Sequence, residues 1–155
     1  YIGRYELTGT VDSPTEKAGT VLTNKDWYNL YKACKNVIKD NSDVKSTMIY
    51  GCQWDETCSW LEKNGYDINN SSDWGNYTGD KKETGSNSKY KANEIYDMAG
   101  NCYDWTQEAN SSGYRIVRGG DYYNSGSSFP ASDRNDIYPY HSPSNYTSRA
   151  TLYIL

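Results

Sequence analysis

Apolar residues recur at helical spacing in two stretches of the chain. In TNKDWYNLYKACKNVIKD, residues 23–40, Thr23 or Asn24 is placed to cap a helix. Its predicted apolar face consists of Trp27, Leu30, Tyr31, Cys34, Val37 and Ile38. In GCQWDETCSWLEKNG, residues 51–65, the predicted face consists of Trp54, Thr57, Cys58 and Leu61. Gly65 stands where the C-cap of this second helix is expected.

Apolar residues alternate in three further stretches, and this pattern predicts strands. These stretches are YIGRYEL (1–7), YRIVRGG (114–120) and RATLYIL (149–155). Between them, residues 66–92 are polar and Gly-rich, which predicts a long loop pinned to the body by Trp74. We therefore expect one α+β domain over residues 1–155, forming the C-terminal part of a longer protein.

Composition narrows the possible classes of function. Only 35% of the 155 residues are hydrophobic, but 17 Tyr and 5 Trp carry enough apolar area for a core. The net charge of −4 and the pI near 5.0 argue against a nucleic-acid partner. No apolar run is long enough to predict a membrane span. The start, YIGRYELTGT, lacks the basic and apolar regions of a signal peptide.

The four cysteines fit no zinc pattern. Cys34, Cys52, Cys58 and Cys102 include no pair with CxxC spacing. Cys52 and Cys58 lie six residues apart on the predicted second helix, too far apart for a strain-free disulfide. We interpret the four as buried or partly buried thiols, and the redox compartment stays open.

The most specific segment is NEIYDMAGNCYDWTQEANSSGYRIVRGGDYY, residues 93–123. It resembles the core signature of the formylglycine-generating-enzyme and sulfatase-modifying family, a branch of the C-type lectin fold. The two predicted helices and YIGRYE stand where this family has its helices and its early strand. The resemblance implies two helices, short antiparallel strands and much irregular loop.

The enzymatic chemistry of that family does not carry over. The formylglycine-generating enzyme binds copper through two cysteines that follow the Arg-Gly-Gly strand, and here the last cysteine is Cys102. His141 is the only histidine, and no order of Ser, Asp and His indicates a catalytic triad. We therefore predict no catalytic residues, with an oxidase or other modifying enzyme of this fold as the alternative.

Some members of the family hold calcium around the same motif. The resemblance implies ligation by the side chains of Asp97 and Asp104 and by the carbonyls of Gly100 and Cys102. Asp104 stands where Glu is commoner, and a metal-free hydrogen-bonded turn is an equal alternative. No other cofactor is expected. A calcium-dependent lectin is a third interpretation, although the Glu-Pro-Asn sugar signature is absent.

Residues 121–147 contain no Lys, Glu, Gln, Met or Trp, whereas residues 1–120 contain 27 of them. With the chain's own composition as the prior, such a window has a chance of about one in a thousand. These five amino acids are the ones that AAC and AAT codons cannot reach when only their adenines change. The window therefore resembles the variable region of a protein diversified by a diversity-generating retroelement, as in gut bacteria and their phages.

The resemblance implies a hypervariable ligand-binding surface within a fixed frame. Arg118, Gly119 and Gly120 precede it and residues 148–154 follow it. Gly126, Pro130, Arg134 and Pro139 also look like frame positions. The candidate ligand-binding residues are Tyr122, Tyr123, Asn124, Ser128, Phe129, Asp133, Asn135, Asp136, Ile137, Tyr138, Tyr140, His141, Asn145 and Tyr146.

The composition of this window is that of an antibody paratope, with Tyr for contact area and Ser and Asn for hydrogen bonds. An exposed Ile137 would be unusual in an ordinary loop but is what a randomised binding position predicts. The alternative for any single Tyr is that its ring covers the core. We expect a protein or glycan ligand on another cell or virion. The expected location is a phage tail tip or a bacterial cell surface.

Overall fold

The computed structural model describes residues 1–155, which form two helices and ten short strands joined by long loops. The helices are α1 (Trp27–Asn36) and α2 (Gly51–Lys63), and one turn of 3-10 helix, η1, spans Ser88–Tyr90. The strands are β1 (Thr8–Gly9), β2 (Pro14–Thr15), β3 (Val44–Met48), β4 (Lys91–Ala92), β5 (Ile95–Tyr96), β6 (Tyr103–Ala109), β7 (Arg115–Arg118), β8 (Arg134–Ile137), β9 (Tyr146–Ser148) and β10 (Ala150–Ile154).

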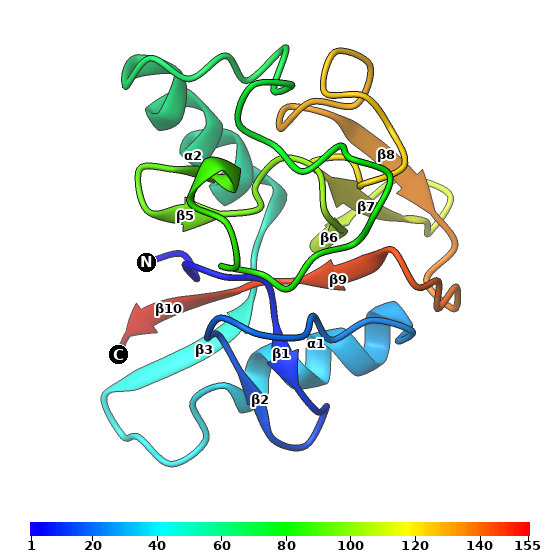
Figure 1. The fold of residues 1–155 in the computed structure, drawn as a ribbon. Helices are drawn as coiled ribbons and strands as arrows, with labels where there is room; N and C mark the ends of the chain where they lie inside the picture. The colour runs from blue at the N-terminus through cyan, green and yellow to red at the C-terminus, as the bar shows by residue number, and fades with distance from the viewer.

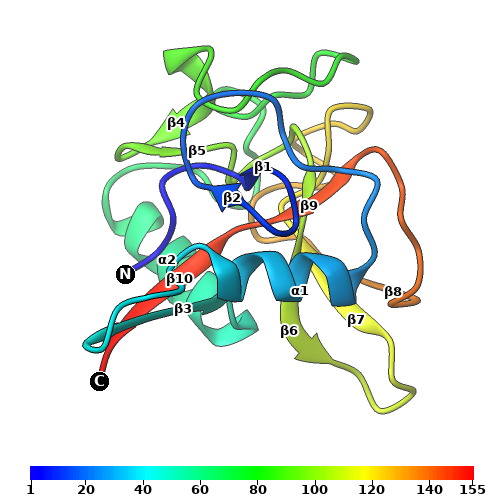
Figure 2. The same ribbon diagram turned by 90° about the horizontal axis from the view of Figure 1, so that it is seen from below.

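The largest sheet has the strand order β8-β7-β6-β9. Its pairs are antiparallel except for β6 and β9, which run parallel with Tyr103 opposite Tyr146. Residues 121–147 therefore supply both edges of this sheet, the whole of β8 and the start of β9. A separate antiparallel ribbon pairs β3 with β10, and α1 packs along β3 (Figures 1 and 2).

Both predicted helices form, but α1 begins later than the sequence indicates. Asp26, rather than Thr23 or Asn24, is its N-cap, and the carboxylate of Asp26 accepts a hydrogen bond from the Asn29 amide at 2.8 Å. Asn24 instead takes a left-handed conformation with φ of 57°. The end of α2 is as predicted, since Gly65 follows the C-cap with φ of 90°.

Residues 1–7 do not form the predicted strand. Ile2 makes only an isolated bridge to Thr151, and the segment runs beside the C-terminal residues through single backbone hydrogen bonds. The expected alternation fails because Glu6 and Leu7 are both completely buried. At the other end of the chain β10 forms as predicted, but Ile154 is exposed because β10 and β3 extend beyond the body (Figure 1).

The interior contains two apolar clusters. One gathers α1, β6 and β7 around Leu30, Trp105 and Val117, and the other gathers α2 and the loops around Trp54 and Met98. Trp74 is buried in the second cluster and so anchors the long loop, as predicted. The thiols are unpaired, with Cys34, Cys58 and Cys102 buried and Cys52 exposed.

A charged group also lies in the interior, centred on the completely buried side chain of Arg149. Its guanidinium pairs with Asp104 at 2.9 Å and donates to the carbonyls of Gly3, Tyr96 and Asp97. The carboxylate of Glu6 lies in the same interior and accepts hydrogen bonds from Asn101 and Cys102.

Three buried carboxylates, those of Glu6, Asp97 and Asp104, thus share one guanidinium. Burial raises the pKa of Asp97 from its ordinary value of 3.8 to about 6. Burial also raises the pKa of Asp104, and it raises the pKa of Glu6 well above its ordinary value. The folded chain therefore holds protons that the unfolded chain has already released between about pH 4 and pH 6.

This proton uptake predicts that the free energy of unfolding falls as the pH rises through about 4 to 6, so the melting temperature should be higher at pH 5 than at pH 8. Asp97→Asn should weaken that dependence and raise the melting temperature at pH 8. The side-chain amide of this variant can donate to the Thr84 hydroxyl, and its oxygen can still accept from the backbone of Gly85. Asn also tolerates the φ of 58° at this position. The exposed Asp73→Asn serves as the control, and equal pH profiles for the two variants would contradict the prediction.

Candidate functional site

Residues 121–147, which we call the window, lie on the side of the molecule away from both termini (Figures 1 and 2). The window leaves the end of β7, forms a loop, returns as β8, and crosses to the opposite edge of the sheet as β9. Most of it has no regular structure, so its position depends on contacts with the rest of the chain.

The rest of the chain holds the window mainly by its backbone. The indole of Trp54 donates to the carbonyl of Ala131 at 2.8 Å, and the hydroxyl of Tyr77 donates to the carbonyl of Phe129 at 2.9 Å. Further backbone carbonyls of the window that accept hydrogen bonds from outside are those of Tyr122, Gly126, Pro139, Pro143, Ser144 and Asn145. Because every residue type offers a carbonyl, this attachment does not depend on which side chains the window carries.

One side chain of the window, that of Asp121, ties its two ends together. It is 2% exposed, and one carboxylate oxygen accepts from the Tyr123 amide at 3.1 Å and from the Asn124 side chain at 2.5 Å. The other oxygen accepts from the side chain of Asn145. Asp121 is therefore a frame residue that the sequence did not single out.

At two positions, a neighbouring backbone segment lies so close that only glycine fits. A Cβ on Gly126 would lie 2.4 Å from the Ser72 amide nitrogen, and a Cβ on Gly120 would lie 2.2 Å from the Phe129 carbonyl. Gly120 also has a φ of 72°, which disfavours other residues. The frame role expected for Gly126 thus has a steric cause.

The other expected frame residues of the window lie in different surroundings. Pro139 is buried, and its carbonyl accepts from the amide of Trp27 at 3.0 Å. Pro130 is half-buried, and its carbonyl accepts from the amide of Asp133 at 2.9 Å. Arg134 is exposed and paired with Glu108, so its contact depends on its side chain.

The candidate ligand-binding residues divide by exposure. The exposed ones are Tyr123, Ser128, Asn135, Asp136, Tyr138, Tyr140 and His141. Those half-buried are Asn124, Phe129, Asp133, Ile137 and Asn145. Ile137 is thus not the exposed residue expected, because its side chain packs against the first apolar cluster.

Tyr122 and Tyr146 are buried, at 6% and 8% exposure. The ring of Tyr146 packs edge-on against Tyr103 and Trp105, with ring centres 5.3 and 5.5 Å apart. Neither Tyr122 nor Tyr146 presents its ring to a partner, in contrast to the expectation from sequence. The parallel pairing of β9 with β6 explains the burial of Tyr146, since it places this residue opposite Tyr103 inside the sheet.

The rings of two tyrosines outside the window contact exposed rings of the window. Tyr28 on α1 lies 5.1 Å from Tyr140, Tyr140 lies 5.4 Å from Tyr138, and Tyr138 lies 5.8 Å from Tyr114, as measured between ring centres. We call these four residues the tyrosine stripe. Neither Tyr28 nor Tyr114 is among the binding residues expected from the sequence, although Tyr28 stands off the apolar face of its predicted helix, which is a signal of exposure.

The residues named for calcium do not form a fitting site. The carboxylate of Asp104 is paired with Arg149, and the carboxylate of Asp97 accepts from the hydroxyl of Thr84 at 2.8 Å. No group of three or more His, Cys, Asp or Glu side chains is arranged to hold a metal ion. A guanidinium among the carboxylates supplies the positive charge that a calcium ion would bring, so the two would repel each other.

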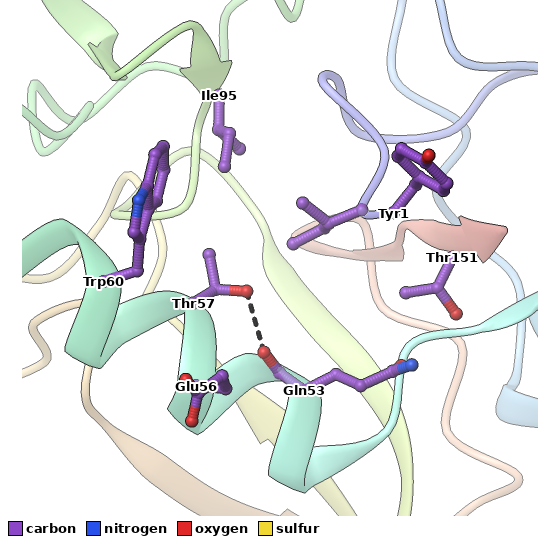
Figure 3. A pocket seen from close by; sticks show the side chains of 8 residues that line it. Tyr1, Gln53, Glu56, Thr57, Trp60, Ile95 and Thr151 are labelled. Atoms are coloured by element: carbon purple, nitrogen blue, oxygen red, sulfur yellow. Dashed lines mark hydrogen bonds between the residues drawn. The ribbon is translucent and has the colours of Figure 1, made fainter. Parts of the chain in front are cut away.

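A pocket of about 460 Å³ lies elsewhere, between α2, the N-terminus and β10 (Figure 3). Its walls include Tyr1, Trp60, Ile95 and Thr151, and Glu56 is its only acidic side chain. On its wall, the Thr57 hydroxyl donates to the backbone carbonyl of Gln53 at 2.7 Å (Figure 3). The lining includes neither Cys nor His.

This arrangement of two helices, short strands and long loops, with the two termini side by side, is the C-type lectin fold. Within that class, the chain belongs to the family of the Sulfatase-modifying factor enzyme 1-like domain, whose profile matches residues 50–151. A search of curated proteins gives no match. No helix has the length and apolar character needed to cross a membrane.

Among solved structures, the chain is similar to Treponema denticola variable protein 1. The TM-score is 0.65 at 17% sequence identity, over 87% of this chain and 71% of that chain. At this identity, the similarity establishes that the two proteins share a fold.

The close approach at Gly126 predicts that Gly126→Ala lowers the free energy of unfolding by about 1–3 kcal/mol, because backbone atoms of Ser72 would have to move. The neighbouring exposed Ser127→Ala should change it by less than about 0.5 kcal/mol. Denaturant unfolding of both variants measures the difference, and equal stabilities would contradict the backbone contact.

The burial of Tyr146 gives a second prediction. Tyr146→Ser should lower the free energy of unfolding by about 3–5 kcal/mol, as expected for removal of a buried ring. Tyr140→Ser, at 61% exposure, should change it by less than about 0.5 kcal/mol. Thermal and denaturant unfolding compare the two, and a stable Tyr146→Ser protein would show that this ring is not part of the core.

Proposed function

We propose that this chain recognises a ligand through the exposed side chains of residues 121–147 and that a diversity-generating retroelement varies this surface. The observation that carries the proposal is the attachment of the window by its backbone. The indole of Trp54 and the hydroxyl of Tyr77 hold carbonyl groups, while rings such as those of Tyr138 and Tyr140 face solvent. A surface held in this way can change its side chains without losing its shape.

The exposed residues suit recognition. Tyr123, Tyr138 and Tyr140 are 70%, 51% and 61% exposed. Each offers a large, fairly rigid contact area, and neighbouring Ser, Asn and Asp side chains provide adaptable hydrogen bonds. The window also lacks the five amino acids that adenine changes in AAC and AAT codons cannot reach.

A catalytic role is not part of the proposal. The window contains no cysteine, and burial raises the pKa of the nearest preceding thiol, Cys102, which keeps it protonated. His141 is exposed, and its amide closes a turn onto the Tyr138 carbonyl at 3.0 Å. The arrangement therefore favours a binding module over an oxidase of the same fold.

The setting that we propose is a phage tail tip or a bacterial cell surface, where the ligand is a protein or glycan on another cell or virion. The name of the structurally similar Treponema denticola variable protein 1 describes a variable protein, which agrees with a diversified surface. The separation of the termini from the window leaves this surface free when the chain is joined to a carrier (Figure 1).

A genomic comparison tests the diversification. We expect a near-copy of the DNA that encodes residues 121–147, beside a reverse transcriptase gene. The copy should differ from the coding sequence only where it has adenine. The differences should fall at exposed positions such as Tyr138 and Tyr140 and spare Gly126, whose backbone contact admits no side chain. A locus without such a copy would contradict the retroelement proposal. Differences between copy and coding sequence that occur at all four bases would contradict it too.

A further inference from the structure

Two exposed rings of the tyrosine stripe belong to fixed parts of the chain. Tyr28 lies in the first turn of α1 and Tyr114 precedes β7, both outside residues 121–147. They are 45% and 39% exposed, and they lie at the two ends of the stripe, with Tyr138 and Tyr140 between them. The exposed aromatic surface thus continues beyond the window on both sides.

A helix holds one of these rings, and a turn between two strands holds the other. The ring of Tyr28 packs edge-on against the buried Trp27, with ring centres 5.3 Å apart, and the N-cap Asp26 fixes the start of the helix. The amide of Tyr114 donates to the side chain of Asn110 at 3.0 Å within the turn between β6 and β7. Both residues lie outside the window, so both rings remain present when the residue types of the window change.

The fixed part of the chain also positions the two rings of the window. Residues 138–141 form a turn in which the His141 amide donates to the Tyr138 carbonyl at 3.0 Å. At the centre of this turn, the carbonyl of Pro139 accepts from the amide of Trp27, next to Tyr28. The turn is thus anchored to the start of α1, which brings Tyr140 into contact with Tyr28.

We propose that the tyrosine stripe is one protein-binding surface, in which Tyr28 and Tyr114 are constant anchors and Tyr138 and Tyr140 are variable ones. This inference rests on the proposed function and adds two residues to its site. Rings that already contact one another lose little conformational freedom on binding. Tyr is also among the residues that contribute most when buried at the centre of an interface.

The shape of the stripe favours a folded protein as the partner. The four main cavities are lined by other residues, and the rings of the stripe are 39% to 61% exposed, so they stand on an open part of the surface. A sugar or another small ligand is usually held in a concave site that surrounds it. An open row of exposed rings instead matches a flat, largely apolar patch on another protein.

Selection from a library tests the inference with a defined probe. The full chain is displayed with its exposed window residues randomised, except for Tyr138 and Tyr140, and is selected against hen egg-white lysozyme. A parallel selection uses mannan, a polysaccharide. Tyr28→Ser, Tyr114→Ser and Tyr153→Ser are then introduced into the selected lysozyme binders. Tyr153 is the matched control because it is 48% exposed but lies on β10.

We expect Tyr28→Ser and Tyr114→Ser each to weaken lysozyme binding by about tenfold or more, as for hot-spot residues, with an unchanged melting temperature. Tyr153→Ser should leave the affinity unchanged. If both stripe variants keep their affinity while Tyr140→Ser loses it, the inference falls and the proposed function stands. Binders to mannan alone would overturn the protein partner, and a library without binders to either probe would overturn the proposed function as well.

Discussion

The buried guanidinium of Arg149 is the interaction on which the rest of the structure depends. It joins the N-terminal segment at Gly3, the β5 end at Tyr96 and the strand β6 at Asp104. Because each of these groups has left water, loss of the guanidinium would leave a buried carboxylate and several carbonyls without a partner, which costs more than an exposed ion pair. Most of the strands are short, so this charged centre holds together distant segments of the chain. In other folds a continuous sheet performs this task.

That centre also supports the sheet to which residues 121–147 belong. It positions β6, and β6 in turn pairs with β7 and with β9, which begins inside the window. Outside the sheet, Trp54 and Tyr77 reach the window through backbone carbonyls, so the shape of the loop depends little on its side chains. The exceptions are the buried side chains of the window, among them Asp121 and Tyr146, and these belong to the fold although they lie within the window.

These features explain how much could be predicted from the sequence. Periodicity located both helices, and the 93–123 motif indicated the fold, because each depends on local pattern. The strand expected at residues 1–7 failed because the burial of Glu6 is decided by Asn101, which is distant in the chain. The same limit applies to the site. Tyr140 and Tyr146 look alike in sequence, and only the pairing of β9 with β6 separates the exposed ring from the buried one.

The restricted alphabet of the window has a physical consequence of its own. Of the five missing amino acids, Lys, Glu, Gln and Met have long side chains that lose the most rotamer freedom when a surface is buried. Among the residues that remain, Arg134 is the one long and flexible side chain, and Tyr provides the largest rigid contact area. Arg134, the one long charged side chain of the window, pairs with Glu108 outside the window, while Lys81 donates to the carbonyl of Ser144. On this surface, short or rigid side chains supply shape and apolar area at low entropic cost, and long charged side chains outside the window, such as Lys81 and Glu108, help to fix its position.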